Sequence, residues 1–78
     1  MVAKFWLDWA RSTIARGDKL PFPSMDREDK AEFYGDLASA YELLAEQAAE
    51  DGDNDAVTRL SKEAERYTRL AEKYRPRY

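Results

Sequence analysis

Apolar and polar positions follow one another along most of the chain at the steps of three and four residues that are typical of amphipathic helices. In two long segments the apolar positions form a heptad seam, which keeps them on one face of each helix. The first seam comprises Tyr34, Leu37, Tyr41, Leu44 and Ala48, and the second comprises Val57, Leu60, Ala64, Tyr67, Ala71, Tyr74 and Tyr78. The pattern predicts one helix over about residues 26–50 and another over about residues 55–75.

The ends of these two helices are marked by capping residues. Ser24 or Asp26 can accept hydrogen bonds from the first turn of the earlier helix. The sequence DGDN follows it, and Gly52 within that sequence suits the left-handed conformation of a helix C-cap. Pro76 prevents the later helix from continuing. So short a turn predicts that the two helices pack antiparallel.

The two seams also predict a register for this helical hairpin. Counting outward from the turn predicts five pairs: Ala48 with Leu60, Leu44 with Ala64, Tyr41 with Tyr67, Leu37 with Ala71, and Tyr34 with Tyr74. Most pairs set a large side chain against a small one, which lets helices interdigitate. We therefore predict an all-α fold in a single domain over residues 1–78, with a slip of about one turn as the alternative register.

A shorter third helix is predicted at the start of the chain, over about residues 3–15. Its apolar side chains cover an arc of about 200° on a helical wheel, about twice the stripe that docking on one groove requires. These side chains are Val2, Ala3, Phe5, Trp6, Leu7, Trp9, Ala10 and Ile14. One edge of the arc should pack on the hairpin, and the other needs a second cover. The candidates are the connector LPFPSM, a second copy of the chain, or another protein.

The large apolar side chains outside the seams lie toward the open end of the hairpin, so we expect the first helix to pack there. A symmetric homodimer through this helix and the adjoining open end would cover the second edge. Trp9 should lie nearer that contact than Leu7, because the two occupy opposite edges of the arc. The predicted protein interface consists of Phe5, Trp6, Trp9, Phe33 and Leu70.

The composition argues against catalysis and metal binding. The 78 residues include no His and no Cys, so neither a Ser-His or Cys-His pair nor an imidazole or thiolate metal ligand is present. Asp51, Asp53 and Asp55 alternate as in a calcium loop, but Ala56 and Lys62 stand where an EF-hand needs Gly and Glu. We expect no enzymatic activity, no cofactor and no metal site.

Charge is divided unevenly along the chain. Residues 26–55 carry eleven acidic and two basic side chains, whereas residues 56–78 carry seven basic and three acidic ones. Basic side chains interleaved with tyrosines can bind nucleic acid, although the net charge of −3 is opposite to the usual sign for such proteins. The candidate contacts with nucleic acid are Arg66, Arg69, Lys73, Arg75 and Arg77.

Taken together, these patterns predict a small interaction module that acts by binding another protein, as an adaptor, regulator or inhibitor. Two alternatives stay open: an accessory protein that binds nucleic acid through its basic C-terminal end, and a structural subunit that folds as an oligomer. No apolar run approaches the roughly 20 residues that span a bilayer, and the start of the chain lacks the apolar stretch of a signal peptide. We therefore expect a cytoplasmic protein with no membrane partner.

Overall fold

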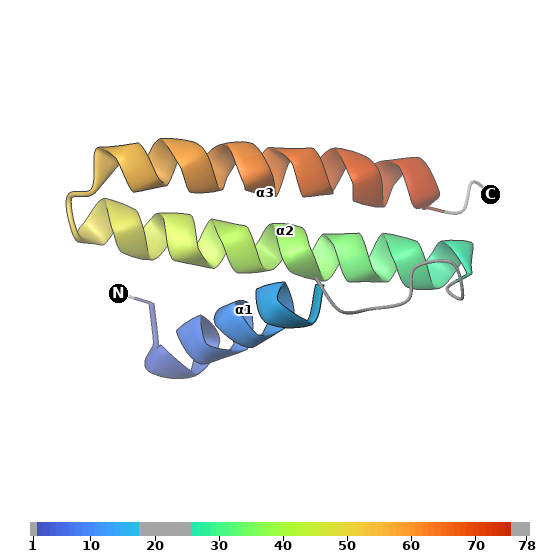
Figure 1. Ribbon diagram of the computed structural model, residues 1–78, viewed down its shortest axis with the longest axis horizontal. Helices are drawn as coiled ribbons and strands as arrows, with labels where there is room; N and C mark the ends of the chain where they lie inside the picture. Colours follow the sequence, from blue (N-terminus) through green and yellow to red (C-terminus); the bar gives the residue numbers. More distant parts are fainter. Residues whose placement is uncertain (1, 18–25, 76–78) are drawn as a thin grey trace.

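The computed structural model describes residues 2–17 and 26–75, and within them it contains three helices. These are α1 (Lys4–Gly17), α2 (Arg27–Glu50) and α3 (Asn54–Tyr74). α2 and α3 lie side by side along the full length of the molecule, and the shorter α1 packs against α2 (Figure 1). The predicted all-α fold, a helical hairpin with a shorter N-terminal helix, is confirmed, with α1 reaching Gly17 rather than residue 15.

Side-chain caps define the ends of α2 and α3. The carboxylate of Asp26 accepts a hydrogen bond from the amide of Asp29 at 2.8 Å, which caps the start of α2. Gly52 has a φ of 77° in the turn, a left-handed conformation that a side chain would strain. Asp53 then caps α3 by accepting from the amide of Ala56 at 3.1 Å. Acidic residues of the DGDN turn thus serve as helix caps.

The register of the hairpin is visible in a stack of four tyrosine rings. Tyr41 stacks on Tyr67 with ring centroids 5.6 Å apart, and Tyr34 stacks on Tyr74 at 5.7 Å, which are two of the predicted pairs. Tyr67 also stacks on Tyr34 at 5.9 Å. The rings therefore alternate between the two helices in the order 41, 67, 34 and 74, so that each inner ring is held on both faces.

The core of the described part is built mostly from alanines. No large side chain in it is fully buried. Its buried apolar residues are Val2, Ala10, Leu37, Ala38, Ala40, Ala45, Ala56, Ala64 and Ala71. Small side chains let the helices approach closely, but they bury little apolar area each. The larger aromatic side chains consequently lie at the margins of the helix contacts, where they are half-buried or exposed.

The prediction that the first helix covers the open end of the hairpin is wrong. α1 runs antiparallel to α2 along the half that leads to the turn (Figure 1). At its start, the amide of Val2 donates a hydrogen bond to Glu50 Oε2 at 3.4 Å, at the last residue of α2. At its end, a Cβ added to Gly17 would lie 3.2 Å from Leu37 Cδ2. α1 therefore ends near the middle of α2.

Small side chains explain this placement. The two residues with no exposed surface are Ala10 on α1 and Ala40 on α2, within the described ranges. Such residues let two helix backbones come close, whereas the prediction from sequence favours the open end because of large side chains such as Phe33 and Leu70. The packing of α1 is thus decided by where α2 carries small side chains rather than by where it carries the largest apolar ones.

One polar group is buried in α1 without compensation. Thr13 is 4% exposed, and its Oγ1 has no hydrogen-bond partner among the described residues. We expect Thr13→Val to raise the free energy of unfolding by about 1 kcal/mol, because valine has the same shape and no hydroxyl to desolvate. Thermal unfolding followed by circular dichroism would show this as a rise in Tm of several degrees.

Thr68→Val is the matched control for this change. The hydroxyl of Thr68 donates to the carbonyl oxygen of Ala64 at 2.9 Å, so its removal gains nothing. If Thr13→Val stabilised the protein no more than Thr68→Val does, the hydroxyl of Thr13 would have a partner in solution.

Candidate protein-interaction surface

Three aromatic side chains gather along one edge of α1. The rings of Phe5 and Trp6 meet edge to face with centroids 5.1 Å apart, and those of Trp6 and Trp9 do so at 6.1 Å. Phe5 is 69% exposed and Trp6 is 49% exposed, while Trp9 is half-buried. The predicted grouping of these three residues on one surface therefore agrees with their positions in the structure.

The exposure of these rings follows from how α1 docks. α1 turns Ala10 and Thr13 toward α2, and these two side chains are buried. Phe5 and Trp9 are four residues apart and share an edge of the helix beside that buried face. Because α1 packs mainly on α2, this edge extends past the contact between the two helices.

A shallow depression lies where this edge of α1 meets α2. Its volume is about 430 Å³, and it is lined by Trp6, Trp9, Ser39, Glu42, Leu43 and Glu46. We call Phe5, Trp6, Trp9 and Leu43 together the aromatic surface. Leu43 is a residue that sequence reasoning missed: it stands alone among acidic residues on the outer face of α2, and its isolation within that face is the signal that marks it. Glu42 and Glu46 are exposed and give the depression an acidic rim.

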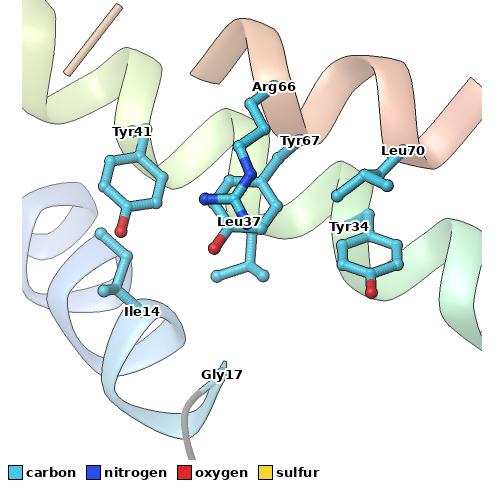
Figure 2. A pocket seen from close by; sticks show the side chains of 8 residues that line it. All are labelled: Ile14, Gly17, Tyr34, Leu37, Tyr41, Arg66, Tyr67 and Leu70. Carbon is cyan, nitrogen blue, oxygen red and sulfur yellow. The ribbon is translucent and has the colours of Figure 1, made fainter. Parts of the chain in front are cut away.

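Phe33 and Leu70, the other two predicted interface residues, do not join the aromatic surface. Phe33 Cζ lies 3.5 Å from where a Cβ of Gly17 would stand, at the end of α1. Leu70 lines a separate cavity together with Ile14, on the other edge of α1 (Figure 2). The predicted set is therefore divided, because α1 lies along the turn half of α2: three residues lie together on α1, Phe33 lies at the end of this helix, and Leu70 lies by its other edge. Trp9 and Ile14 do fall on opposite edges, as their spacing predicted.

The second cavity lies between the end of α1 and the hairpin, and it encloses about 250 Å³. Its described lining residues are Ile14, Gly17, Tyr34, Leu37, Tyr41, Arg66, Tyr67 and Leu70 (Figure 2). The guanidinium of Arg66 lies 5.4 Å from the centroid of the Tyr67 ring, and burial raises the pKa of the Tyr34 hydroxyl above its usual value. The described lining includes no carboxylate, so it offers no general base to activate these phenols.

The basic residues predicted to contact nucleic acid are described except for Arg77, which lies outside the described residues. Arg66 Nη1 lies 3.5 Å from Glu63 Oε2, and Arg69 Nη2 lies 2.7 Å from Glu65 Oε1. These cations are thus partly balanced by carboxylates of their own helix. Lys73 and Arg75 lie at the end of α3, and both are exposed.

A cluster of cations around Tyr74 was not predicted. Arg27 and Lys30 from the start of α2 join Lys73 there, with their charged groups 5.9, 5.4 and 5.5 Å from the ring centroid respectively. Arg27 also donates a hydrogen bond to the carbonyl oxygen of Lys73 at 2.7 Å, which satisfies a carbonyl group in the last turn of α3. Arg27 and Lys30 are the only two basic residues within 26–55, and that rarity is the signal that could have indicated a specific role.

Other kinds of site find no support in the part of the chain that the structure describes. Within residues 2–17 and 26–75, no three acidic, His or Cys side chains come together so that they could hold a metal ion. None of the described helices combines the length and the apolar character needed to span a bilayer. The chain has no significant match among known protein families, curated proteins or solved structures. Among the described residues, the exposed large apolar side chains are Phe5 and Trp6, and both belong to the aromatic surface.

Proposed function

We propose that this protein is a non-enzymatic protein–protein interaction module that binds through its aromatic surface. The observation that carries this proposal is the exposure of Phe5 and Trp6, at 69% and 49%, beside the half-buried Trp9 and Leu43. Exposed apolar patches with a polar rim are typical of contact sites. Tryptophan in particular is enriched among the residues that dominate binding energy at interfaces.

The setting of these residues also favours binding over a purely structural role. The rings of α1 are fixed by edge-to-face contacts with one another, so little conformational freedom is lost when a partner covers them. The depression beside them offers a place for a partner's side chain, and its acidic rim can discriminate among partners by charge. Catalysis has no comparable support, since the chain contains no His or Cys. No cofactor is required for binding of this kind.

Site-specific photo-crosslinking in the cells that produce the protein tests this proposal. With p-benzoylphenylalanine in place of Phe5, we expect a covalent adduct with a protein after illumination, and we expect Trp6→Ala in the same chain to reduce it. The same crosslinker at Thr58, which is exposed on α3, serves as the control and should give no adduct. The absence of any adduct at position 5, or an adduct that Trp6→Ala does not reduce, would contradict the proposed function.

Binding to nucleic acid is the second candidate function. It is favoured by the three cations around Tyr74, which extend the basic end of α3 with Arg27 and Lys30 from α2. It ranks below protein binding because Arg66 and Arg69 are balanced by neighbouring carboxylates and the net charge is −3. For either function the cytoplasm is the location we expect.

A further inference from the structure

We infer that the partner of the aromatic surface is a second copy of this chain, bound about a two-fold axis with the two α1 helices antiparallel. This inference rests on the proposed function and names the occupant of the same surface. Two observations carry it: a projecting side chain and a matching depression lie on one surface, and that surface has charges of opposite sign at its two ends.

The projecting side chain is Phe5, and the depression beside it is lined by Trp9 and Leu43. Phe5 is 69% exposed and is not among the residues that line this depression, so the molecule does not fill the depression with its own Phe5. A two-fold axis at the level of Leu7, in the first half of α1, would place each Phe5 level with Trp9 of the other copy. Both depressions are then filled at once, which gives the closed, isologous interface of a dimer.

The charges agree with this orientation. In each molecule α1 is antiparallel to α2, so in the dimer α1 of one copy runs parallel to α2 of the other. With Phe5 set against Leu43 of the other copy, Arg16 lies eleven residues further along, beyond the end of that α2. This position is level with the turn that follows α2, where Asp51 is exposed, and with the first turn of α3, where Asp55 is exposed.

Arg16 also lies on the correct edge of α1. It follows Phe5 by eleven residues and Trp9 by seven, and both steps return to nearly the same face of a helix. Its side chain is exposed, and no acidic side chain within residues 2–17 and 26–75 forms an ion pair with it. The antiparallel arrangement therefore places Arg16 of each copy near the acidic turn of the other copy. A parallel arrangement would instead set the two Arg16 side chains together.

Sedimentation equilibrium of the purified full chain tests the inference. We expect a reversible monomer–dimer equilibrium at micromolar concentration, and we expect Phe5→Ala to raise its dissociation constant by about tenfold or more. Because Phe5 is 69% exposed, this variant should keep its helix content by circular dichroism. A chain that stays monomeric at the highest concentration, or a dimer that Phe5→Ala leaves unchanged, would overturn the inference.

A charge-reversal pair tests the orientation. Arg16→Glu should weaken the dimer several-fold, and so should Asp51→Lys combined with Asp55→Lys, since each variant sets like charges against each other. A mixture of the two variants should form a heterodimer about as tight as the wild type. Arg69→Glu, which makes the same charge change far from the surface, is the control. No recovery in the mixture would show that the antiparallel arrangement is wrong.

Failure of this inference differs from failure of the proposed function. If the crosslinker at position 5 yields an adduct of twice the chain's mass, the second copy is the partner in cells. If it yields only an adduct with a different protein and the purified chain is monomeric, the surface binds proteins but the inferred partner is wrong. If it yields no adduct, the proposed function itself fails.

Discussion

Replacing Ala64 by glutamate is expected to lower the free energy of unfolding by several kcal/mol, roughly the whole stability of a domain this small. Ala64 is 4% exposed and lies where α3 meets α2, so a glutamate there loses its hydration without gaining a partner. Loss of helical circular dichroism at room temperature, or a steep fall in the midpoint of urea denaturation, would measure the effect.

Thr58→Glu provides the matched control, because it adds the same charge to an exposed position of the same helix. We expect it to change stability by less than about 0.5 kcal/mol. If Ala64→Glu unfolded at the same urea concentration as this control, α3 would not pack on α2 through Ala64 and the seam would be misplaced.

The second large effect is expected at the centre of the tyrosine stack. Tyr67 lies between Tyr41 and Tyr34, with ring centroids 5.6 and 5.9 Å away, so its removal breaks two stacking contacts at once. We expect Tyr67→Ala to lower the free energy of unfolding by about 3 kcal/mol, from lost apolar burial and lost ring contacts together. Chemical denaturation of the purified variant would measure this loss.

Two further variants separate the ring from other contributions. Tyr67→Phe keeps the ring and should cost little, whereas Tyr74→Ala removes a ring at the end of the stack, which contacts Tyr34 alone. Tyr74→Ala should therefore cost less than Tyr67→Ala. Equal losses for the two alanine variants would mean that the rings do not form one continuous stack.

The candidate surface was partly predictable. Phe5, Trp6 and Trp9 could be grouped because neighbouring positions on one helix keep the same relation in any fold that preserves the helix. Leu43 could not be added to them, because the depression that it lines with Trp6 and Trp9 lies between two helices. Phe33 and Leu70 lie apart from them for the same reason, because their relation to the surface depends on where α1 docks.

The hairpin itself was determined by the sequence alone. Heptad spacing predicts which faces of α2 and α3 meet, the DGDN turn predicts their direction, and the short turn limits the register to within about one turn. Each of these signals acts over a few residues, so each can be recognised without knowing the rest of the fold. The pairing of Tyr41 with Tyr67 and of Tyr34 with Tyr74 follows from them directly.

Only the tertiary structure decided where α1 lies and what gathers around it. Its docking depends on close approach at small residues such as Ala10 and Ala40, and a small side chain leaves little trace in a pattern of apolar bulk. The cations around Tyr74 likewise come from the start of α2 and the end of α3, and they meet only once these helices are paired. Contacts between distant segments depend on the summed packing of whole helix faces, which local spacing does not specify.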